Sequence, residues 1–128
     1  MRLRHWLPPV VWMGVIFLGS TSLGSGENTG NFLLPILKSL LPWATHEQLL
    51  LLHTILRKGG HFTEYAILSW LWHRAFIFHG RSGSAAWRAL GISVGYALFD
   101  EIHQGWTGVR GASAGDVLID GMGAATAL

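Results

Sequence analysis

The residues best suited to chemistry in this chain lie in two short polar clusters between apolar segments. One cluster covers residues 57–65 and the other covers residues 99–120. A charged side chain in apolar surroundings costs free energy unless it is paired or hydrogen-bonded, so polar groups gathered in this way indicate a functional site.

The spacing of these residues predicts that each cluster presents a polar helix face. Residues three and four apart lie on the same face of a helix, so His61, Glu64 and Tyr65 share a face. The same spacing recurs in Asp100, His103 and Gln104, with Glu101 turned aside, and Asp116 and Asp120 are four residues apart.

Such faces could transfer protons or hold a polar head group. An imidazole titrates near neutral pH, so His61 or His103 could act as a general acid or base, oriented by a carboxylate. The candidate catalytic residues are His61, Glu64, Asp100, Glu101 and His103. The candidate binding residues, which include an Arg suited to a two-pronged contact with phosphate or carboxylate, are Lys58, Tyr65, Gln104, Arg110, Ser113 and Asp116.

The sequence identifies no cofactor and no metal site. Two His and two carboxylates suit zinc, but the spacing of His61, Glu64, Asp100 and His103 is not a recognised metal signature. The chain has no Cys, which excludes disulfides and thiol nucleophiles.

Structural interpretations of the same residues remain open. His61 and Glu64 could be a hydrogen-bonded pair that joins helices. Asp100 and Glu101 next to Arg110 could form a structural ion pair. Asp120, deeper in its apolar segment, could be an internal hydrogen-bonding group.

The composition is typical of a membrane protein. The chain has 128 residues, of which 50% are hydrophobic and only 12% are charged, whereas soluble domains carry about 25% charged residues. Its mean hydropathy is +0.37. Seven Trp and seventeen Gly agree with the enrichment of these residues in membrane proteins. A net charge of +2 is too small to indicate a nucleic-acid partner.

The apolar segments predict an all-α, integral membrane four-helix bundle in one domain, with spans at about 7–23, 62–78, 85–101 and 112–128. Pro8 and Pro9 are expected at the start of the first helix. Residues 24–60 are predicted to be an extramembrane loop with an interfacial helix that Thr45 caps and that ends near residue 57. A poorly formed extra span is the alternative. Gly91 and Gly95 predict a close helix–helix approach.

The distribution of Arg predicts the orientation, because cytoplasmic loops collect Lys and Arg. This rule makes both termini cytoplasmic and puts both polar clusters on the extracytoplasmic face of a bacterial inner membrane. Five Arg residues lie in the predicted cytoplasmic segments and support this orientation: Arg2, Arg4, Arg74, Arg81 and Arg88. Four basic residues lie in the predicted extracytoplasmic segments and are evidence against it: Lys38, Arg57, Lys58 and Arg110.

Several of these motifs resemble the VanZ-like family of small bacterial membrane proteins, named for a member linked to teicoplanin resistance. The motifs are Lys58-x-x-His61-Phe62-x-Glu64-Tyr65-Ala66-x-Leu68, Asp100-Glu101-x-His103-Gln104, Arg110, Ser113, and Asp116-Val117 followed by Gly121 and Gly123. The chain departs from the family pattern at Gly108-Val109, where Pro-Gly is expected, and at Asp120, where Asn is expected. The resemblance implies a multi-span helical protein of the cell envelope and does not imply a particular reaction.

Three functions are compatible with these observations. The chain could be an enzyme acting on a phospholipid or lipid-linked wall precursor at the outer leaflet. It could be a module that binds an amphiphile, including a lipoglycopeptide antibiotic such as teicoplanin, without changing it. It could also be a structural or partner-binding protein in which the polar residues only join helices. Membrane lipids are the expected partners in each case, and charges at one face rather than near the midplane argue against a transporter.

Overall fold

The computed structural model describes residues 3–19, 26–107 and 114–128, and the regular elements in these ranges are all helical. The expected all-α class is confirmed. The elements are α1 (Leu3–Gly19), α2 (Gly26–Leu40), α3 (His46–Phe78), a 3₁₀ turn (Ser82–Ser84), α4 (Ala85–Thr107) and α5 (Ala114–Thr126).

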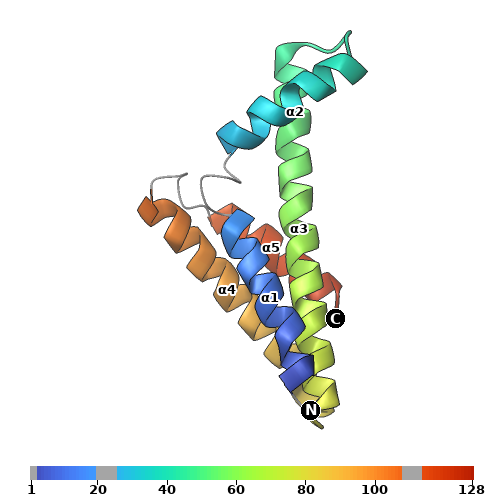
Figure 1. The fold of residues 1–128 in the computed structure, drawn as a ribbon, viewed down its shortest axis with the longest axis vertical. Coiled ribbons are helices and arrows are strands. Elements are labelled where there is room, and N and C mark those ends of the chain that lie inside the picture. Colours follow the sequence, from blue (N-terminus) through green and yellow to red (C-terminus); the bar gives the residue numbers. More distant parts are fainter. Residues whose placement is uncertain (1–2, 20–25, 108–113) are drawn as a thin grey trace.

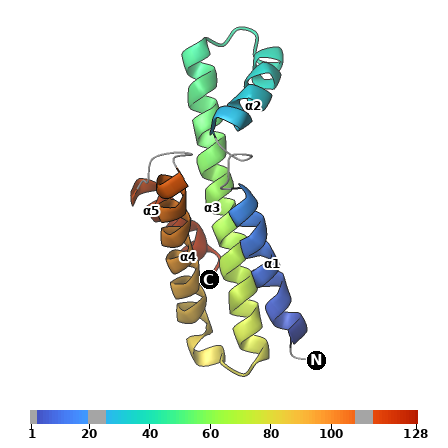
Figure 2. The same ribbon diagram turned by 60° about the vertical axis from the view of Figure 1, so that its left-hand side comes forward.

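Helix α3 is the axis of the molecule. Helices α1, α4 and α5 surround its lower half and form with it what we call the bundle, while α2 packs against its upper half (Figure 1). We call α2 and residues 46–60 of α3 the extension. Figure 2 shows that α1 and α4 lie on different sides of α3 and that α3 and α4 join at the end where α1 begins.

The sequence prediction for residues 45–78 is corrected in one respect. Thr45 is the expected N-cap: its hydroxyl accepts a hydrogen bond from the backbone N–H of Gln48, whose side chain accepts one from the N–H of Thr45. The helix does not end near residue 57, however, and continues through Gly59 and Gly60 to Phe78. The interfacial helix and the predicted span over residues 62–78 are thus one helix.

The extension contains a second helix, α2, where the sequence predicted a loop. Helix α2 packs against α3. Leu37 of α2 is buried, and so are Leu49 and His53 of α3. Leu49 and His53 are one helical turn apart, so they present one face to the neighbouring helix. This packing favours helical structure before the two glycines, each of which costs about 1 kcal/mol in a helix interior.

Helix α1 begins earlier than expected, before its two prolines. Proline inside a helix removes a hydrogen bond and costs about 3 kcal/mol, so other contacts must hold the first turn. The His5 ring stacks on Phe78 with 4.2 Å between centroids, and Trp6 lies 5.3 Å from Phe76. These aromatic contacts fix the start of α1 against the end of α3.

Small residues bring the bundle helices together in α5, whose richness in Gly and Ala favours close packing, and not at Gly91 and Gly95 of α4. A Cβ added to Gly123 of α5 would meet the carbonyl oxygen of Phe62 on α3. Around Gly91 and Gly95, by contrast, no described atom of another element lies within 4 Å of the corresponding position. The close approach predicted for α4 is therefore absent among the described residues, and the tight contact is between α5 and α3.

The core of the bundle is small and its outer surface is strongly apolar. Its buried hydrophobic residues are Ile16, Tyr65, Leu68, Ala97 and Ala124. Large apolar side chains, including Leu7, Val11, Leu98, Ile102 and Leu118, are exposed. In the part of the chain that the structure describes, no helix has the length and apolar character needed to cross a membrane. The integral-membrane assignment stays a prediction.

Candidate polar site

The candidate site is centred on His61, which lies in α3 where α5 packs against it. The His61 Nδ1 atom is 3.6 Å from Asp120 Oδ1 on α5 and 3.9 Å from Glu64 Oε2, one turn further along α3. Asp120 is only 1% exposed, whereas His61 and Glu64 are half-buried. The imidazole thus faces a buried carboxylate from another helix and a more exposed one from its own.

The site depends on the tight contact between α3 and α5. Gly123 lies three residues after Asp120, and its Cα approaches the backbone of Phe62, the residue after His61. Only a residue without a Cβ fits there, so Gly123 sets the separation at which Asp120 meets His61. The sequence pattern showed glycines in this segment but not which helix they would contact.

Helix α4 contributes two more buried carboxyl groups. Asp100 is 1% exposed and Glu101 is 3% exposed. Helices α3 and α5 both pack on α4, and Glu101 is buried as well as Asp100. Both carboxyl groups act electrostatically on Asp120, so carboxyl groups from α4 and α5 are concentrated in the bundle interior.

His103 lies beyond Asp100 on α4 and is held by aromatic contacts. Its ring is 4.9 Å from Phe17 of α1 and 6.2 Å from Phe99 between centroids. Its Nδ1 atom is buried and has no hydrogen-bond partner among the described residues. His103 is thus near α1.

The predicted binding residues fall into different environments. Tyr65 is fully buried in the core, where its hydroxyl has no hydrogen-bond partner in the described ranges and its ring lies 6.5 Å from Tyr96. Lys58 is exposed on α3. Asp116 is half-buried in the first turn of α5 and acts electrostatically on Asp120. Arg110 and Ser113 lie outside the described residues, and so does the side chain of Gln104.

Two residues that the sequence analysis missed attach α1 to this region. The indole Nε1 of Trp12 donates a hydrogen bond to the carbonyl oxygen of Glu64 at 2.9 Å. The hydroxyl of Tyr96 donates one to the carbonyl oxygen of Met13 at 2.6 Å. Trp and Tyr at apolar positions carry a polar handle that usually finds a partner when buried. The sequence could therefore have indicated that Trp12 and Tyr96 form hydrogen bonds, but not with which residues.

The described side chains do not form a metal centre. Within residues 3–19, 26–107 and 114–128, no group of three or more His, Asp or Glu side chains is arranged to hold a metal ion. The donor set considered from the sequence, which included His61 and His103, is not brought together. What the arrangement can do is accept hydrogen bonds through its carboxyl groups and exchange a proton through His61.

Comparisons with known proteins give one match. No curated protein and no solved structure is significantly similar to the chain. The model of the VanZ/LLP1 family matches residues 6–128, which is nearly the whole sequence. This match agrees with the resemblance carried by the motifs around His61 and Asp100. The chain therefore belongs to the VanZ/LLP1 family and is a VanZ-like cell-envelope protein.

Proposed function

We propose that this chain is embedded in the bacterial inner membrane and that its polar site binds the head group of an amphiphile at the extracytoplasmic face. The observation that carries the proposal is the buried Asp120 carboxylate facing His61 in a bundle with an apolar exterior. Ionisable groups inside an apolar bundle are costly and mark functional positions by default.

The exposed aromatic and aliphatic residues support the membrane location. Trp87 is 78% exposed near the start of α4, and Trp106 is 87% exposed near its end. A rise of 1.5 Å per residue separates them by about 28 Å along the helix, close to the roughly 30 Å of a bilayer's hydrocarbon core. Exposed Leu98 and Ile102 lie between them. Trp at both interfaces is the usual arrangement of a membrane helix.

The chemistry of the described side chains favours a head group that donates hydrogen bonds. Carboxyl groups accept hydrogen bonds through their oxygens, and Glu64, Asp100, Glu101 and Asp120 all gather within the same part of the bundle. An ammonium group or sugar hydroxyls would complement them. The candidate ligands are an ethanolamine phospholipid, a lipid-linked wall precursor and a lipoglycopeptide such as teicoplanin, with Lys58 and Arg110 proposed to contact a phosphate or carboxylate of the same ligand.

A second function, proton transfer to or from the bound head group, is favoured by the position of His61. A carboxylate against one ring nitrogen of a histidine orients the ring and stabilises its protonated form. Asp120 faces Nδ1 of His61 in this way. His61 would then be the general acid or base of an enzyme, with Asp120 as its orienting group.

Native mass spectrometry of protein released from bacterial membranes in mild detergent tests both functions. The variants are His61→Ala and Asp120→Asn, and His73→Ala is the matched control, because His73 lies on α3 about 18 Å further along its axis. Wild type and control are expected to carry an amphiphile that both site variants lose. An unchanged ligand supports binding alone, and a product that only wild type and control release supports catalysis.

Two results would contradict these proposals. Equal ligand retention by the two site variants and the control would leave the polar residues with a purely structural role. Release of the chain from membranes by alkaline carbonate washing would exclude the membrane location separately, whatever the ligand result.

In addition, loss of the site is expected to remove any protection against teicoplanin that the wild-type chain gives a susceptible host.

A further inference from the structure

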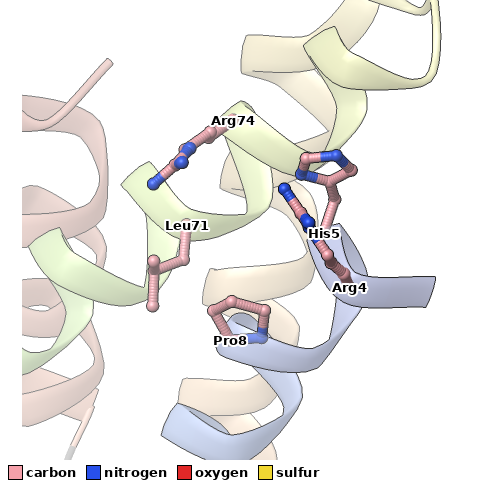
Figure 3. A pocket seen from close by; sticks show the side chains of 5 residues that line it. All are labelled: Arg4, His5, Pro8, Leu71 and Arg74. Carbon is pink, nitrogen blue, oxygen red and sulfur yellow. The ribbon is translucent and has the colours of Figure 1, made fainter. Parts of the chain in front are cut away.

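A second polar feature lies at the opposite end of the bundle, where α1 meets the C-terminal part of α3. It is a cavity of about 110 Å³ lined by Arg4, His5, Pro8, Leu71 and Arg74. Figure 3 shows these side chains on facing segments of the two helices. Two guanidinium groups and an imidazole therefore border one small space.

Aromatic rings hold two of these groups in place. The guanidinium carbon of Arg74 is 5.7 Å from the centroid of the Trp70 ring and 5.5 Å from that of Phe78. His5 stacks on the same Phe78 ring at 4.2 Å. Cation–π contacts leave the N–H edge of a guanidinium free for ligands, so Phe78 acts as a common support for Arg74 and His5.

The cavity has cationic groups without nearby anionic partners. Helix α1 contains no acidic residue, and the nearest acidic residue before Arg74 on α3 is Glu64, about 15 Å away along the helix. Neither Arg4 nor Arg74 forms an ion pair with any residue that the structure describes. The pKa of His5 is lowered, first by desolvation and then by Arg4, His79 and Arg74. An anion entering the cavity would relieve this repulsion.

An apolar groove lies along α1 and shares one residue, Arg4, with the cavity. It has a volume of about 390 Å³ and is lined by the side chains of Leu3, Trp6, Leu7 and Val10, with Arg4 shared between groove and cavity. A basic cavity and an apolar groove that both border Arg4 match an amphiphile with an anionic head and a hydrocarbon chain. It does not match a free phosphate ion, which has no apolar part.

We propose that this cavity and groove form a second lipid site, in which Arg4 and Arg74 bind the phosphate of an anionic phospholipid and the groove holds its acyl chain. This inference rests on the proposed membrane location but not on the polar site around His61. The head group would lie at the cytoplasmic side, the end of the bundle that the Arg distribution assigns to the cytoplasm. The site differs from the first in charge, since it is basic where the first is acidic.

The test uses the full chain in nanodiscs of phosphatidylcholine with a minor fraction of phosphatidylglycerol, followed by native mass spectrometry of the lipids that remain bound. Wild type is expected to retain one phosphatidylglycerol in preference to phosphatidylcholine. Arg4→Gln and Arg74→Gln are each expected to weaken this retention about tenfold, since charge-assisted hydrogen bonds to phosphate are about twice as strong as neutral ones. Arg74→Lys keeps the charge but not the planar fork, so an intermediate loss is expected.

Arg81→Gln is the matched control, because Arg81 is an exposed residue at the same end that does not line the cavity. Its lipid retention should equal that of wild type. Equal retention in all variants, or equal retention of both lipids by wild type, would overturn the proposal. Competition by millimolar inorganic phosphate would assign the cavity to a free anion instead. A chain that carbonate washing removes from membranes contradicts the membrane location, whereas a retained chain without lipid selectivity contradicts only this site.

Discussion

Replacement of Gly123 by Ala tests whether the contact between α3 and α5 holds the bundle and its polar site together. The added Cβ would meet the carbonyl oxygen of Phe62 and would lie 2.9 Å from its carbonyl carbon and 3.0 Å from its Cα. These are backbone atoms of a long helix, so they cannot rotate aside. Helix α5 must move away from α3, and Asp120 must move away from His61.

The expected loss of unfolding free energy is obtained by comparison with a control substitution at Gly121, two residues away. A Cβ at Gly121 would lie 3.6 Å from Cγ2 of Val94, an ordinary contact. Both substitutions gain the same helix propensity, up to about 1 kcal/mol, and this gain cancels when the two variants are compared. Overpacking costs about 1–3 kcal/mol, so the free energy of unfolding of Gly123→Ala should lie below that of Gly121→Ala by about this amount.

Thermal unfolding of both variants in the same detergent, followed by circular dichroism at 222 nm, gives the comparison. Gly121→Ala is expected to be at least as stable as wild type, and Gly123→Ala should have a lower Tm and retain less amphiphile. Equal stability of the two variants would show that α5 can shift at no cost. The reasoning that connects Gly123 to the polar site would then be refuted.

Three further predictions concern other contacts. Thr45→Ala should cost the extension about 1 kcal/mol and speed amide hydrogen exchange in the first turn of α3; unchanged exchange would contradict the capping role. Tyr96→Phe removes the hydrogen bond to Met13 and should lower the free energy of unfolding by about 0.5–1.5 kcal/mol, measured by denaturant titration; no change would mean that this bond contributes nothing. Burial, and then Arg57, lower the pKa of His53 from its ordinary value of 6.5. The unfolded chain therefore binds this proton more readily, and the stability of the extension should fall as the pH drops below 6.5. His53→Leu should remove this dependence in hydrogen exchange measured between pH 7.5 and 5, and a persistent dependence would assign it to another group.

Features that depend on local chemistry could be predicted from the sequence. The cap at Thr45 follows from a hydroxyl and an amide three residues apart, and His61 and Glu64 share a helix face because the helical period fixes their directions. The family was also identifiable, because its motifs are local in sequence. Each of these inferences needs only residues within one or two helical turns of one another.

Features that depend on contacts between helices could not be predicted in the same way. The pairing of Asp120 with His61 requires α5 to approach α3 at Gly123, and nothing in the sequence around Gly123 names its neighbour. The burial of Glu101 likewise arises because two helices cover α4. A pattern of apolar and polar positions gives the direction of a side chain on its own helix, but it does not give the surface that the side chain meets.

Helix α2, where the sequence predicted a loop, shows how tertiary contacts can decide secondary structure. Pro35 and Lys38 interrupt the apolar pattern of residues 32–41, yet α2 continues through both. Its packing against the leucine-rich start of α3 stabilises a helix that its own sequence supports weakly. Tertiary contacts routinely override local preference in this way.

The two glycines inside α3, Gly59 and Gly60, form a point at which the extension can bend relative to the bundle. Residues 46–60 of α3 form an arm about 22 Å long, and a Cβ added at Gly59 or Gly60 would meet no described side chain within 4 Å. Since glycine pairs are among the usual sites of helix kinks, bending is cheapest at this point. A bend of about 20° there would swing the tip of the arm by about 8 Å. The helices of the bundle would keep their packing while α2 moves relative to them.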